Sequence, residues 1–68
     1  MENNEFGKAI QQLRIEYNLS QRQFGELFNV SNQAVSFWES GQREPDMDIV
    51  KKISAYFGVT IDYLYGKE

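Results

Sequence analysis

Hydrophobic residues recur along this sequence at helical spacing, and short polar breaks separate the segments that carry them. The first segment predicts a helix over roughly residues 4–17, because its apolar residues fall at intervals of four, three and four positions. These residues, which we expect to face a core, are Phe6, Ile10, Leu13 and Tyr17. Ile15 lies opposite this stripe and is expected to be exposed.

Two short helices joined by a tight turn are predicted at about residues 21–40. Ser20 is a suitable N-cap for the first of them, and Ser31 is a suitable N-cap for the second. Asn29 can end the first helix, because asparagine tolerates the left-handed backbone conformation. Gly25 has no side chain, which lets the next helix approach closely. The apolar stripe of the first helix consists of Phe24, Leu27 and Phe28.

The second of these helices has two different faces. Its inward face is predicted to contain Ala34, Val35 and Trp38. Its outward face is predicted to contain Asn32, Gln33, Ser36, Phe37 and Ser40. Asparagine and glutamine can pair with adenine in the major groove of DNA, serine can bond to bases or phosphates, and an aromatic ring can contact a thymine methyl. The face therefore suits base reading, and the alternative interpretation is the ordinary polar surface of a soluble helix.

Two more helices are predicted after the loop that contains Pro45. Asp46 and Asp48 favour the start of the longer helix, Gly58 ends it, and Thr60 caps a short last helix. The face of the longer helix expected to meet the core contains Met47, Val50, Ile53, Ser54 and Phe57. The short helix carries more apolar surface than its length can bury, which favours either a partner or closure of the core. These residues are Ile61, Tyr63, Leu64 and Tyr65.

Length and composition narrow the possible functions. The 68 residues allow one domain, expected over residues 1–68. The chain has no cysteine or histidine, which removes disulfides, most zinc sites and histidine-dependent catalysis. We therefore expect no enzymatic activity, no metal and no cofactor. No apolar run is long enough to cross a membrane, so we expect a cytoplasmic protein.

The charge of the chain argues partly against binding to nucleic acid. Seven basic and ten acidic residues give a formal net charge of −3, whereas nucleic-acid-binding proteins are usually basic. Net charge governs non-specific attraction, while docking depends on how charges lie across one face. Any binding to DNA should then be comparatively weak or cooperative.

Many positions match one known pattern. Within the two-helix motif they are Gln21, a small residue at position 25, a turn residue at position 29, the apolar Phe24, Phe28, Val30 and Val35, and the terminal Trp38-Glu39-x-Gly41. Outside it they are Leu13-Arg14 and Phe57-Gly58-Val59-Thr60-x-Asp62-Tyr63-Leu64. With these residues the chain resembles the Cro and lambdoid-repressor (XRE-like) family of helix-turn-helix transcription regulators. It departs from the family at Gly25, where alanine is usual, at Asn29, where glycine is usual, and at Phe37, where a polar or basic residue is common.

The resemblance implies a compact all-α domain of five helices, similar to the DNA-binding domain of lambda repressor. It also implies sequence-specific binding to double-stranded DNA, and a transcription regulator, by default a repressor, of the phage, plasmid or mobile-element type. The second helix of the motif would lie in the major groove. The expected base-reading residues are Asn32, Gln33, Ser36 and Phe37. Contacts with the DNA backbone are expected from Gln21, Ser31, Ser40, Gln42 and Arg43, and then from Lys8, Arg14 and Arg22. The resemblance also implies an ion pair between helices formed by Arg14 and Glu39, and the alternative is two separately solvated charges.

A homodimer on a two-fold symmetric operator is expected, because one short recognition helix reads only a few base pairs. The surplus apolar surface of the last helix places Tyr63, Leu64 and Tyr65 near the dimer axis. The competing interpretation is a helix-turn-helix that binds another protein, as in an antitoxin or adaptor. The acidic charge and Phe37 favour this alternative, whereas the adjacent Asn32 and Gln33 favour DNA.

Overall fold

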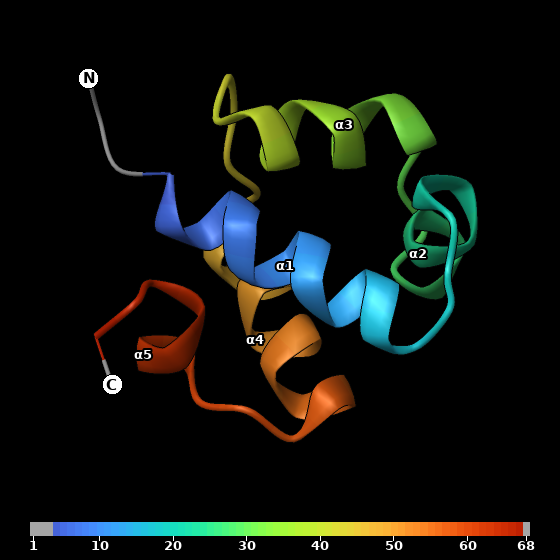
Figure 1. Ribbon diagram of the computed structural model, residues 1–68. Helices are drawn as coiled ribbons and strands as arrows, with labels where there is room; N and C mark the ends of the chain where they lie inside the picture. The colour runs from blue at the N-terminus through green and yellow to red at the C-terminus, as the bar shows by residue number, and fades with distance from the viewer. Residues whose placement is uncertain (1–3, 68) are drawn as a thin grey trace.

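The computed structural model describes residues 4–67, which form five helices and no strand. The helices are α1 (Glu5–Glu16), α2 (Gln21–Leu27), α3 (Asn32–Ser40), α4 (Met47–Phe57) and α5 (Ile61–Leu64). In Figure 1, α1 lies between α3 on one side and α4 and α5 on the other, and α2 lies beside one end of α3. The predicted all-α, five-helix fold is confirmed. The expected domain limits at residues 1–3 and 68 lie outside the described residues.

A side chain caps the start of each of these helices. Its oxygen accepts a hydrogen bond from the backbone N–H three residues further along, which satisfies one of the donors left unpaired in the first turn. The caps are Asn4, Ser20, Ser31, Asp46 and Thr60. In α2 the bond is reciprocal, because Gln23 Oε1 accepts from the Ser20 N–H at 2.8 Å. The helix boundaries are thus specified locally.

One hydrophobic core joins the five helices. Its buried side chains are Phe6, Ile10, Leu13, Phe24, Phe28, Val35, Trp38, Val50, Ile53, Phe57 and Leu64. Three residues predicted to face the core are instead largely exposed: Tyr17, Leu27 and Met47, at 53%, 40% and 50%. Each stands at a helix end, where its side chain is only partly covered. Tyr17 still packs edge-on against Phe57 of α4, with ring centroids 4.9 Å apart. Ile15 is exposed, as predicted.

Two glycines allow close backbone approach. A Cβ atom at Gly7 in α1 would lie 2.5 Å from the carbonyl oxygen of Trp38 in α3, so α1 and α3 can approach this closely only without it. A Cβ atom at Gly25 would lie 2.5 Å from the carbonyl oxygen of Val30. It would also lie 3.2 Å from the carbonyl oxygen of Ser31, the N-cap of α3, so Gly25 makes room for the turn and, as predicted, for the start of the next helix.

Candidate nucleic-acid interface

The carboxylate of Glu39 ties α3 to α1 and α2. Arg14 Nε on α1 donates to Glu39 Oε2 at 2.7 Å, and Arg14 Nη2 donates to Glu39 Oε1 at 3.2 Å. Gln21 Nε2 on α2 donates to Glu39 Oε1 at 3.1 Å. The two charged side chains are only 15% and 5% exposed. Arg14 and Gln21 are both expected at the DNA backbone. In the structure the Arg14 guanidinium and the Gln21 amide nitrogen instead bond to Glu39 and so link α1 and α2 to α3.

A second link reaches the end of α3 from the start of α1. Asn4 Nδ2 donates to the carbonyl oxygen of Glu39 at 2.7 Å, while Asn4 Oδ1 accepts from the N–H of Gly7 at 3.2 Å. Sequence reasoning missed this role. The position of Asn4 before an apolar stripe could have identified a helix cap, but nothing local to it indicates contact with Glu39.

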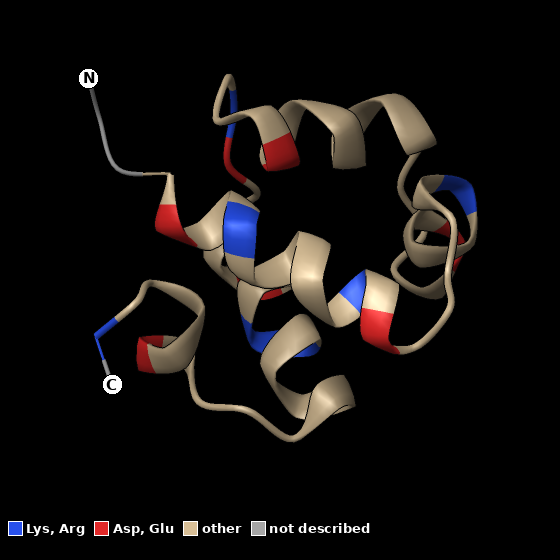
Figure 2. Cartoon of the chain, in the orientation of Figure 1, with Lys and Arg blue, Asp and Glu red and all other residues tan. Residues whose placement is uncertain are grey.

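The outward face of α3 is uncharged. Asn32, Gln33 and Ser40 are exposed, and Ser36 and Phe37 are half-buried, while Val35 and Trp38 are buried. Glu39 is the only charged residue of α3, whose ribbon is otherwise tan in Figure 2. Its carboxylate accepts hydrogen bonds from Arg14 of α1 and Gln21 of α2. What α3 presents outward is therefore a set of amides, hydroxyls and one aromatic ring.

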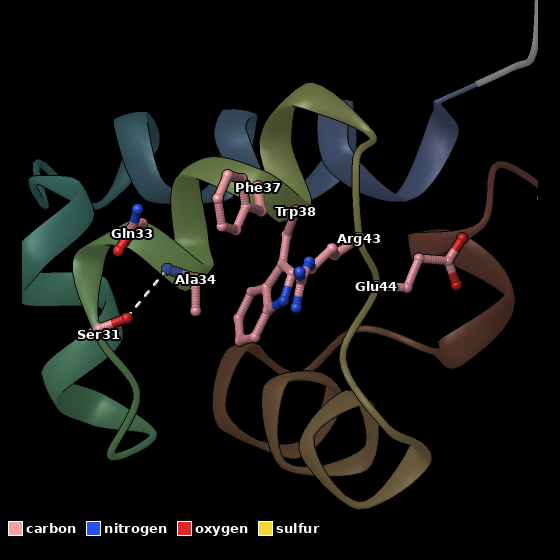
Figure 3. Close-up of a pocket in the computed structure, with 7 residues that line it drawn as sticks. All are labelled: Ser31, Gln33, Ala34, Phe37, Trp38, Arg43 and Glu44. Carbon is pink, nitrogen blue, oxygen red and sulfur yellow. Dashed lines mark hydrogen bonds between the residues drawn. The ribbon is translucent and has the colours of Figure 1, made fainter.

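A hollow of about 340 Å³ lies beside this face (Figure 3). The residues that line it are Ser31, Gln33, Ala34, Phe37, Trp38, Arg43 and Glu44. The guanidinium carbon of Arg43 lies 5.4 Å from the centroid of the Phe37 ring. Arg43, which the sequence predicts to be a backbone contact, thus reaches into the region of the predicted base readers.

The other predicted backbone contacts occupy different places. Ser31 precedes α3, and Ser40 and Gln42 stand at its far end, so these residues flank the outward face. Arg22 is exposed on α2, 3.5 Å from Glu26. Lys8 lines a separate hollow with Tyr63, so it belongs to the side of the molecule formed by α1 and α5.

The last helix does not provide the predicted dimer surface in full. Leu64 is completely buried, because in this single-turn helix it is the residue turned toward the core, and it therefore offers no surface to a second copy. Tyr65 is half-buried and its ring stacks on Phe6, with centroids 5.3 Å apart. Burial, together with the negative charge of Glu44, raises the pKa of Tyr65. Tyr63 remains 38% exposed.

In this structure α2 and α3 are two short helices joined by a tight turn, and α3 presents amides and hydroxyls outward. This arrangement is typical of helix-turn-helix domains. Residues 10–64 match the family described as helix-turn-helix. The chain belongs to this family, in its XRE-like branch of transcriptional regulators.

Two curated relatives and one solved structure support this assignment. The HTH-type transcriptional activator BcrR of Enterococcus faecalis is 48% identical over 94% of this chain and 31% of its own length. The HTH-type transcriptional regulator ImmR of Bacillus subtilis is 34% identical over 91% of this chain and 49% of its own. The crystal structure of a transcriptional regulator from Listeria innocua aligns with a TM-score of 0.82 at 32% identity, covering 87% of this chain and 55% of that one.

The chain spans about a third to about half of the length of these relatives. Among the helices of residues 4–67, none has the length and apolar character needed to cross a membrane.

Proposed function

We propose that this chain binds double-stranded DNA in a sequence-specific manner and regulates transcription, with α3 in the major groove. The observation that carries the proposal is the uncharged outward face of α3, supported from behind by Glu39 and the core. Amide and hydroxyl groups on a rigid helix suit direct reading of base edges. The proposed base-reading residues are Asn32, Gln33, Ser36 and Phe37.

Contacts with the phosphate backbone are proposed at the two ends of α3. Ser31 lies at one end and Gln42 lies at the other, so they can fix the register of the helix in the groove. Ser40 is left out of this set, because its one hydroxyl proton is donated to the carbonyl oxygen of Phe37. These side chains are uncharged, and Arg14 is engaged by Glu39. The complex should therefore release few counterions, and its affinity should fall only gently with salt.

A homodimer on a two-fold symmetric operator is proposed for the DNA-bound state. One short recognition helix reads only a few base pairs, and a second copy doubles the reading. With Leu64 buried, the surface proposed for contact between copies centres on Tyr63. Footprinting should show two half-sites about 34–36 Å apart, and a single unrepeated half-site would contradict the dimer.

Repression is the proposed effect on transcription, because a domain seated over a promoter blocks polymerase without needing any further contact. The relative BcrR is named an activator, so the sign of regulation requires its own measurement. A reporter gene placed behind the selected operator should fall in expression when the chain is produced. A rise in expression would show activation instead.

The DNA-binding proposal is tested by selecting duplexes from a random pool and measuring their affinity by mobility shift. One sequence should be enriched and bound at least about a thousandfold more tightly than unrelated DNA. Failure to enrich any sequence, together with no shift at low salt, would reject the proposal and leave protein binding as the function of this face.

A further inference from the structure

The loop after α3 is fastened to α3 at Phe37. The backbone N–H groups of Gln42 and Arg43 both donate to the carbonyl oxygen of Phe37, at 3.0 and 3.3 Å. The hydroxyl of Ser40 donates to the same oxygen at 3.1 Å. Ser40 itself belongs to α3, and the start of the loop cannot leave α3 without breaking the two backbone bonds from Gln42 and Arg43, so the backbone of Arg43 is positioned by the helix itself.

The side chain of Arg43 turns back over the ring of Phe37. It reaches from the loop toward α3, whereas Glu44 points away from α3 (Figure 3). At 5.4 Å from the ring centroid, the guanidinium carbon is within the range of a cation–π contact. Such a contact does not use the N–H groups of the guanidinium as hydrogen-bond donors, so they can bond outward.

The hollow beside Phe37 and Arg43 combines two kinds of surface. Phe37, Ala34 and Trp38 give it an apolar lining, and Gln33 and Arg43 place hydrogen-bond donors around it. Glu44 also lines the hollow, and its carboxylate points away from α3 (Figure 3). An apolar lining of this kind suits the methyl group of thymine, and the fork of a guanidinium matches the O6 and N7 atoms of guanine. Because the two surfaces adjoin, they match neighbouring bases.

We propose that Phe37 and Arg43 form one specificity-determining unit, in which Phe37 contacts a thymine methyl and Arg43 donates to the adjacent guanine. The inference rests on the proposed DNA binding of α3. It reassigns Arg43 from the phosphate contact predicted from the sequence to the reading of a base. The departure of Phe37 from the family pattern then has a function, because the ring holds the arginine in place.

The test uses the duplex that the wild-type chain selects and two base analogues within it. Uracil in place of thymine removes only the methyl group, and 7-deazaguanine in place of guanine removes the N7 acceptor. At one dinucleotide step, uracil should weaken wild-type binding roughly three- to tenfold, and 7-deazaguanine should weaken it roughly tenfold. Phe37→Ala should be insensitive to uracil at that step, and Arg43→Ala should be insensitive to 7-deazaguanine.

Two conservative variants distinguish a joint unit from two independent contacts. Phe37→Leu keeps an apolar contact but removes the stacking surface, so it should retain the uracil effect and lose most of the 7-deazaguanine effect. Arg43→Lys keeps the charge but not the planar fork. It should retain the salt dependence of binding and lose the 7-deazaguanine effect.

Three results would overturn the inference. One is that Arg43→Ala weakens the selected and unrelated duplexes by the same factor, as expected for a phosphate contact. Another is that neither analogue has an effect at any position of a duplex that is bound specifically. These two results would leave the proposed function intact. The third is absence of binding to every duplex, which would reject the proposed function and this inference together.

Discussion

The guanidinium of Arg14 and the carboxylate of Glu39 meet at 2.7 Å although the two residues stand 25 positions apart in the chain. Both side chains are shielded from water, so loss of either one strands a charge. Glu39→Gln preserves the shape of the side chain and should lower the free energy of unfolding by about 3 kcal/mol, measured by urea denaturation.

Glu26→Gln is the matched control for this change. Glu26 lies 3.5 Å from Arg22 in a pair whose side chains are 65% and 81% exposed, so its replacement should cost less than about 0.5 kcal/mol. A double-mutant cycle of Arg14→Met and Glu39→Gln should reveal strong coupling. Equal losses in the two glutamate variants, or no coupling in the cycle, would contradict the prediction.

Gly7→Ala should destabilise the protein, although alanine is the better helix former by about 1 kcal/mol. The added Cβ would meet the Trp38 carbonyl at 2.5 Å and displace the side chain of Asn4 from its contacts. We expect a loss of about 2 kcal/mol in thermal unfolding, in the range seen when groups are forced into a packed site. Stabilisation by about 1 kcal/mol would show that α1 and α3 can separate freely.

Gln33→Ala should relax the specificity of DNA binding at one operator position. A lost bidentate contact to a base costs about 1–3 kcal/mol of discrimination at that position. Gln42→Ala, in the loop after α3, should weaken binding to all sequences equally, because a phosphate contact carries no sequence information. Affinities for a panel of single-base operator variants measure both effects, and indistinguishable profiles would contradict the assignment.

Tyr65 should make the protein less stable at high pH. Its pKa is raised in the folded state, so its stabilising contribution is complete below the unfolded-state value of about 10 and is lost as the pH rises through the folded-state value. Urea unfolding between pH 8 and 11 should therefore show a shallower decline for Tyr65→Phe than for the wild type. The same slope for the two proteins would contradict the prediction.

The sequence predicts the helices well where the signals are local. Ser20, Ser31 and Gly58 mark helix ends through bonds or backbone angles within a few residues, so the chain around them carries the whole signal. Helical periodicity gives the direction of a side chain but not how far the neighbouring helices extend. For that reason Tyr17 and Met47, at helix ends, were predicted to face the core and are exposed.

The sequence predicts the outward face of the candidate site on α3, but it does not predict the contacts that hold α3 and the loop after it in place. The outward direction of Asn32 and Gln33 follows from the spacing of α3 alone. The bond from Asn4 to Glu39 and the contact of Arg43 with Phe37 depend on how separate segments pack, and no local pattern records them. Leu64 shows the same limit, because a single helical turn has too few residues to reveal its buried side.

The scarcity of cations around α3 bears on how such a domain would search a genome. Lys51 and Lys52 lie on α4, on the other side of α1 from α3 (Figure 2). Sliding along DNA depends on sequence-independent attraction between cations and phosphates. If α3 binds DNA as proposed, little of that attraction is available at its face beyond Arg43, so this domain would locate its operator mainly by repeated collisions from solution. Few molecules would be held at random sites, so operator occupancy would follow the concentration of the protein closely.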